Sequence, residues 1–143
     1  YYAADRRYNI GIINKHLEDG DIVILDRYVE SNMAHQGGKE EDKNKRYEIY
    51  NFIYELEFNL LKLIKPDIVI FLHMPTKYAL ELRKNRASLD EHEKSIKHLT
   101  MAENAYLELK DKYNFKYISC VKEDKLRNIE EINNELYELV RNI

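Results

Sequence analysis

The 143-residue sequence has no tryptophan, two prolines, four glycines and one cysteine. The single cysteine, Cys120, excludes an internal disulfide framework and is typical of a protein from a reducing cytoplasm. No apolar run reaches the length of a membrane span, and no signal peptide is visible, so a membrane partner is not expected. The five histidines lack the spacing of metal ligands, which argues against a zinc site.

The sequence also lacks an excess of basic residues. Lys and Arg number 23 against 26 Asp and Glu, which gives a net charge of -3. Proteins that bind nucleic acids usually carry a basic excess, so no nucleic-acid partner is expected. The length suits one domain with a core of its own.

A third absence concerns phosphate binding. The sequence contains no G-x-x-x-x-G-K-[ST], the loop whose backbone amides and lysine hold the phosphates of ATP. It begins with Tyr1-Tyr2 instead of Met, and residues 3–7 already look like the middle of a helix. We therefore expect a piece of a longer protein whose beginning is missing.

The most informative stretch that is present is Ile22-Val23-Ile24-Leu25 followed by Asp26-Arg27. Four branched apolar residues predict a short strand buried on both faces. In an open parallel sheet, ligands bind just beyond the carboxyl ends of the strands. There Asp26 could organise a hydrated cation and Arg27 could bind a phosphate. From this stretch alone, a solvent-facing ion pair is an equally good interpretation.

The rest of the chain alternates helices with apolar strands. Strands are predicted over residues 67–72 and 115–120, and helices over residues 2–18, 32–36, 44–64, 76–82, 94–112 and 129–143. This order predicts βαβ crossovers and an α/β protein with a three-layer α/β/α architecture around a parallel sheet. The helix over residues 44–64 is apolar on more than one face, so it is either central or shared with another subunit.

Several segments, in register along nearly the whole chain, resemble thymidylate kinase. They are YAADRR at residues 2–7, DRYVESNMAHQG at 26–37, KPD at 65–67, ALE at 79–81 and AYLEL at 105–109. The resemblance implies a P-loop, nucleoside-monophosphate-kinase-like fold whose N-terminal strands and P-loop are absent here. It also implies transfer of the terminal phosphoryl group of ATP to dTMP with Mg²⁺, in a cytoplasmic homodimer.

The resemblance assigns roles in the acceptor site. Tyr2 corresponds to an aromatic residue that stacks on thymine, and Arg6 to an arginine that reaches its 4-oxo group. Arg27 corresponds to the arginine that grips the acceptor monophosphate, while Asp26 lies near the metal and acts on it through water. Asn32 corresponds to a residue that faces the thymine edge. The other substrate-binding positions are Ser31, His35, Gln36 and His92.

The resemblance also implies a lid at about residues 83–93. Its cations are Arg83, Lys84 and Arg86, and Glu93 corresponds to a lid carboxylate near the phosphates. With Asp26 and Arg27, the residues Arg83, Arg86 and Glu93 make up the implied catalytic set. Phosphoryl transfer depends mostly on positioning and on neutralising spreading negative charge, which explains the abundance of cations.

The sequence departs from the family at several positions. His35 stands where the family usually has Tyr or Phe beside the sugar. In the lid, His92 replaces an aromatic or apolar residue, and Glu91 replaces an arginine. Two alternatives to thymidylate kinase stay open: a deoxynucleoside kinase, and a non-catalytic remnant that binds nucleotide or dimerises. Because the phosphate loop is absent, we expect no phosphoryl transfer by the 143 residues alone. His73, at a strand end, is interpreted as structural.

Overall fold

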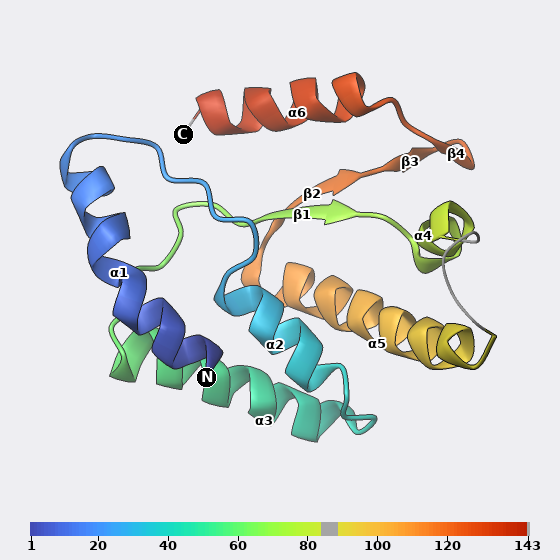
Figure 1. Cartoon of the computed structure of the whole chain (residues 1–143), viewed down its shortest axis with the longest axis horizontal. Coiled ribbons are helices and arrows are strands. Elements are labelled where there is room, and N and C mark those ends of the chain that lie inside the picture. The colour runs from blue at the N-terminus through green and yellow to red at the C-terminus, as the bar shows by residue number, and fades with distance from the viewer. Residues whose placement is uncertain (84–88, 143) are drawn as a thin grey trace. The chain divides into compact units, whose positions relative to one another are not determined.

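The computed structural model describes residues 1–83 and 89–142, although not the side chains of residues 83–95. The chain forms two compact units, Tyr1–Pro66 and Asp67–Ile143 (Figure 1). Each unit contains buried apolar side chains, such as Tyr50 in the first and Leu109 in the second. That both units belong to one domain stays a prediction.

The described elements of the first unit are helical. They are α1 (Tyr2–Glu18), α2 (Val29–Gly37), α3 (Lys43–Tyr54) and η1 (Glu55–Leu60), a π-helix that continues α3. The first helix has the bounds predicted from its apolar periodicity. The second begins at Val29, ahead of the predicted residue 32, so Ser31 lies in its first turn. Asp42 caps α3 by accepting a hydrogen bond of 2.9 Å from the backbone N–H of Lys45.

The helix predicted over residues 44–64 ends at Leu60, and its last segment is wider than an α-helix. The backbone N–H of Leu61 donates to the carbonyl of Leu56 at 2.9 Å, which is the i to i+5 spacing of a π-helix. Lys62 then adopts a positive φ of 54°, a conformation that takes the chain out of the helix. Both Glu57 and Phe58 of this segment are buried.

Helices α2 and α3 pack closely at Gly37. A Cβ atom at this position would lie only 2.2 Å from the Cε1 atom of Tyr50, whose side chain is completely buried. The absence of a side chain at Gly37 is therefore what allows α2 to approach the aromatic ring on α3. This contact fixes the helix that carries the predicted acceptor-site residues Ser31, Asn32, His35 and Gln36.

The strand predicted over residues 22–25 is not found, and the prediction that it is buried was wrong. These residues form neither helix nor strand, and Ile22 and Ile24 are 74% and 75% exposed. A strand needs a neighbour to pair with its backbone groups, and no described strand pairs with this segment. The apolar run therefore has no assigned secondary structure and is largely open to solvent.

The second unit contains the described strands. Its elements are β1 (Ile70–His73), α4 (Thr76–Arg83), α5 (Leu89–Tyr113), β2 (Lys116–Ser119), β3 (Val121–Lys122), β4 (Lys125–Leu126) and α6 (Ile129–Arg141). Strands β1 and β2 are parallel, with Ile70 opposite Lys116 and His73 opposite Ser119, and β3 and β4 form an antiparallel hairpin. Asn128 caps α6 by accepting a 3.0 Å hydrogen bond from the backbone N–H of Glu130.

These elements make the protein an α/β protein. The strands predicted over residues 67–72 and 115–120 are present as β1 and β2, joined by helices in a βαβ crossover (Figure 1). The described residues form two two-stranded sheets, so the three-layer parallel sheet stays a prediction. In the described part of the chain, no helix combines the length and the apolar character needed to cross a membrane.

Candidate functional site

Three helices of the first unit bring Arg6, Asn32 and Glu57 together. The Nε and Nη2 atoms of Arg6 donate to the two carboxylate oxygens of Glu57 at 2.6 and 2.7 Å. The Nδ2 atom of Asn32 donates to the Oε1 atom of the same carboxylate at 3.0 Å. The Glu57 side chain is 0% exposed and that of Arg6 is 18% exposed. The site is thus a buried carboxylate that holds two of the predicted base-reading residues.

Local sequence explains how each element presents its polar group. Arg6 precedes the buried Ile10 by one helical turn, so both lie on the inner face of α1. Asn32 is next to the buried Met33 on α2. Glu57 lies between Leu56 and Phe58 on η1, and it was not among the site residues predicted from the sequence. The signal was present, because an acid inside a broadly apolar helix needs a cation for a partner.

Burial and charge also act on the residues around this carboxylate. Burial raises the pKa of Glu30, and the negative charge of Glu57 raises it further, whereas Arg6 lowers it. Burial raises the pKa of the Tyr28 hydroxyl as well, against the lowering effect of Arg6. The Tyr28 hydroxyl donates to the carbonyl oxygen of Ile64 at 3.2 Å. Arg6 therefore acts against burial at both groups, because its positive charge lowers the pKa of Glu30 and of Tyr28.

Asp26 and Arg27 lie on an exposed turn that leads into α2. Arg27 has a positive φ of 71°, a strained conformation for a residue with a side chain. Its Nε atom donates to the Oγ atom of the buried Ser31 at 2.7 Å, which holds the side chain over the first turn of α2. The N–H groups of a helix N-terminus attract anions, so this turn combines two anion-binding features.

The other predicted acceptor-site residues are on the same helices. Tyr2 is 71% exposed and lies one turn before Arg6 on α1, so the two share a helix face. His35 and Gln36 are half-buried in the last turn of α2, and the Oε1 atom of Gln36 accepts a hydrogen bond of 2.9 Å from Lys39.

The predicted lid is only partly covered. Lys84 and Arg86 lie outside the described residues. Arg83 ends α4, and His92 and Glu93 belong to α5, but their side chains are not described. The lid assignments stay predictions.

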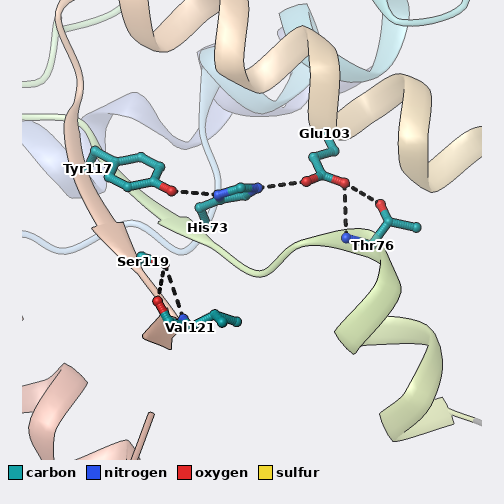
Figure 2. A network of polar contacts seen from close by, with 6 residues as sticks. All are labelled: His73, Thr76, Glu103, Tyr117, Ser119 and Val121. Atoms are coloured by element: carbon teal, nitrogen blue, oxygen red, sulfur yellow. Dashed lines mark hydrogen bonds and ion pairs between the residues drawn. The ribbon is translucent and has the colours of Figure 1, made fainter. Parts of the chain in front are cut away.

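A second polar network lies in the other unit, around His73 (Figure 2). The two ring nitrogens of His73 are each 2.7 Å from a partner, the hydroxyl of Tyr117 and the Oε1 atom of Glu103. The Oε2 atom of Glu103 accepts hydrogen bonds from the backbone N–H of Thr76 at 2.9 Å and from its hydroxyl at 2.5 Å. Glu103 therefore fixes the start of α4 to α5, which supports a structural role for His73.

We expect replacement of Glu103 by glutamine to destabilise the chain in a pH-dependent way. Burial acts to raise the pKa of Glu103, but hydrogen bonds from Thr76 and His73 outweigh it, so the pKa lies below its ordinary value. A carboxylate with a lowered folded pKa stabilises the protein above its unfolded pKa, and this contribution is lost as the pH falls through the folded value. Glu103→Gln should lower the free energy of unfolding by about 1–2 kcal/mol at pH 7.

Urea unfolding at pH 7 and below about pH 4 measures this difference, which should shrink on acidification. Asp111→Asn is the control, because Asp111 is an exposed carboxylate on the same helix. A loss of stability that is equal at both pH values would mean that the Glu103 charge has no part in it.

Metal binding and thiol chemistry receive little support from the geometry. Within the described residues, no group of three or more His, Cys, Asp and Glu side chains could hold a metal ion. The pKa of the buried Cys120 thiol is raised by burial and lowered by Arg127, with a net increase, so the thiol is not activated.

Comparisons with known proteins show which family this chain resembles. The family model described as Thymidylate kinase matches residues 1–135. The chain is 33% identical over 143 residues to "Thymidylate kinase" of Prochlorococcus marinus (strain NATL2A), an alignment that covers 99% of the chain and 64% of that protein. It is 33% identical over 132 residues to "Probable thymidylate kinase 1" of Saccharolobus solfataricus, covering 91% of the chain and 61% of that protein.

A third relative is "Probable thymidylate kinase" of Methanocaldococcus jannaschii, which is 31% identical over 142 residues. This alignment covers 99% of the chain and 65% of the relative. The chain thus spans slightly less than two thirds of the length of each of these three proteins.

Proposed function

The chain belongs to the thymidylate kinase family, and from that premise we propose that it carries the acceptor site of an enzyme that transfers the terminal phosphoryl group of ATP to dTMP, giving dTDP. The observation that carries this proposal is the arrangement of Arg6 and Asn32 on one buried carboxylate. Two side chains from different helices are thereby held where they can bind the edge of one base.

In this proposal Tyr2 contributes affinity for the base, and Arg6 contributes selectivity between bases. The ring of Tyr2 offers a stacking surface, which any base can use. Arg6 offers only donors, which suit the 4-oxo acceptor of thymine and oppose the 4-amino donor of cytosine. The proposal therefore predicts a preference for dTMP over dCMP.

Recognition of the acceptor phosphate is assigned to the turn before α2. Arg27 supplies a fixed positive charge, and the first turn of α2 supplies backbone N–H groups. Ser31 supports the Arg27 side chain, and His35 and Gln36 are proposed to contact the substrate further along the helix. Asp26 fits a magnesium ion bound with ATP, because Mg²⁺ keeps several of its waters and a single exposed carboxylate can bind one of them.

The transfer step itself is proposed to use Arg83, Arg86 and Glu93 in the lid, with Lys84 as a further cation. Charge on the transferred phosphoryl group spreads over its oxygens in the transition state, where cations stabilise it. His92 is proposed to contact the substrate from the same lid. Because the 143 residues contain no G-x-x-x-x-G-K-[ST], we expect them to bind dTMP without phosphorylating it.

A homodimer is also part of the proposal. Phe52 and Leu60 are 66% and 73% exposed, and they line a surface hollow with Leu56 on α3 and η1. An exposed apolar helix face of this kind is suited to packing against a second copy. The same feature supports the alternative that the chain serves only as a dimerisation module. A cytoplasmic location stays a prediction from the single cysteine.

Calorimetric titration of the 143-residue chain with dTMP, thymidine and dCMP tests the proposal. We expect dTMP to bind more tightly than thymidine, because of the phosphate contact, and more tightly than dCMP, because of the base contact. Equal affinity for dTMP and dCMP would contradict the assignment of a thymine site.

A further inference from the structure

Glu57 has a more specific arrangement than stability requires. A buried ion pair can often be replaced by apolar side chains of similar volume with no loss of stability. Here the carboxylate is fully buried and accepts three hydrogen bonds, two from Arg6 and one from Asn32. It also lies on the π-helical segment η1, a conformation that is rare and often occurs at functional sites. These features indicate that the carboxylate orients its two partners, Arg6 and Asn32.

The first consequence concerns the amide of Asn32. An ionised carboxylate accepts hydrogen bonds and cannot donate them. Because Nδ2 of Asn32 donates to Glu57 at 3.0 Å, rotation of the amide by half a turn would bring Oδ1 against the carboxylate oxygen. Glu57 therefore holds Asn32 in one orientation, with Oδ1 on the side away from the carboxylate, where it can accept a hydrogen bond.

The second consequence concerns the guanidinium of Arg6. Its Nε and Nη2 atoms are engaged by the two oxygens of Glu57, and this paired contact fixes the plane of the group. The Nη1 atom carries two further N–H groups. Arg6 thus presents a donor from a fixed plane, and Asn32 presents an acceptor from a fixed amide.

We propose that Glu57 is a positioning residue that selects 4-oxo pyrimidine monophosphates. The pattern it fixes, a donor from Arg6 and an acceptor from Asn32, matches the 4-oxo acceptor and the N3–H donor of thymine and uracil. Cytosine presents the reverse pattern, a 4-amino donor and an N3 acceptor. Without Glu57 the Asn32 amide can rotate, and the discrimination that depends on its orientation is lost. This inference rests on the proposed function.

The test is Glu57→Gln in the 143-residue chain, with calorimetric titration of dTMP and dCMP. Glutamine keeps the volume of the side chain but replaces one carboxylate oxygen by an NH₂ group. The Oδ1 atom of Asn32 can accept a hydrogen bond from this group, and the NH₂ group of Asn32 then faces the base. We expect the ratio of the affinities for dTMP and dCMP to fall about tenfold, because one mismatched hydrogen bond changes an affinity by about this factor. A purely structural role would weaken both ligands together and leave the ratio unchanged.

Glu55→Gln is the matched control, because Glu55 is an exposed carboxylate on the same π-helical segment and accepts a hydrogen bond from Asn59 at 2.7 Å. It should leave the ratio unaltered. A second variant, Glu57→Asp, keeps the negative charge but withdraws it by one methylene, and should lower the ratio by a smaller factor.

The outcomes separate the two proposals. A parent chain without preference for dTMP overturns the proposed function. A parent with that preference, and a ratio that persists in folded Glu57→Gln and Glu57→Asp, overturns the role of Glu57 alone. If both variants fail to fold while Glu55→Gln folds, Glu57 serves stability and the inference is likewise overturned.

Discussion

Replacement of Arg6 by alanine is expected to lower the free energy of unfolding by about 3–5 kcal/mol, the usual result of leaving a buried charge without its partner. Glu57 is completely buried and receives two short hydrogen bonds from Arg6. Asn32 supplies a third bond, but it brings no positive charge. Urea unfolding of the parent and of Arg6→Ala measures the effect.

Two further variants define the origin of this loss. Arg7→Ala removes an exposed arginine from the same helix and should have little effect. The double variant Arg6→Ala/Glu57→Leu removes the buried charge as well, so it should recover much of the stability lost in Arg6→Ala. Equal stability of Arg6→Ala and Arg7→Ala would mean that Glu57 does not depend on Arg6.

Replacement of Arg27 by alanine is expected to weaken binding of dTMP about ten- to a hundredfold, since a hydrogen bond to a charged group contributes about 1.5–3 kcal/mol. Thymidine lacks the phosphate, so its affinity should change little. Arg27→Lys restores the charge but cannot form two parallel hydrogen bonds, and should recover only part of the affinity. Calorimetry with dTMP and thymidine measures both effects.

Thymidine is the internal control in this experiment. Arg27 has a strained backbone with a φ of 71°, and its Nε atom bonds to Ser31, so substitution can also alter the local structure. Such an alteration affects both ligands, whereas loss of a phosphate contact affects dTMP alone. A similar loss for thymidine and dTMP would contradict the role of Arg27.

The elements that sequence predicted well depend on local signals. Helix α1 follows from apolar periodicity, and the start of α6 from the capping residue Asn128, whose partner is only two positions away. The parallel pair β1 and β2 follows from two apolar runs with helices between them. In the two helices the sequence neighbours of a residue determine its conformation, and in the two strands they determine the apolar run that forms each strand.

The features that sequence did not predict depend on the fold. Residues 22–25 have strand-like composition, but pairing and burial require a neighbouring strand, and composition does not supply one. The π-helical segment interrupts a helix whose apolar pattern continues through it. Glu57 meets its partners Arg6 and Asn32 across 51 and 25 residues, a distance at which no spacing rule operates.

The exposed segment at residues 22–25 has a consequence for the behaviour of the chain in solution. Short apolar segments rich in β-branched residues, with unpaired backbone groups, can add to one another edge to edge and seed aggregation. The charged residues on both sides, Asp21 before the run and Asp26 after it, are of the kind that opposes such stacking. These two charges oppose association only at the ends of the run. Because association of two chains depends on their concentration, aggregation of a purified sample should increase as its concentration rises. Titrations of this chain are therefore best performed with dilute protein in the cell and nucleotide in the syringe.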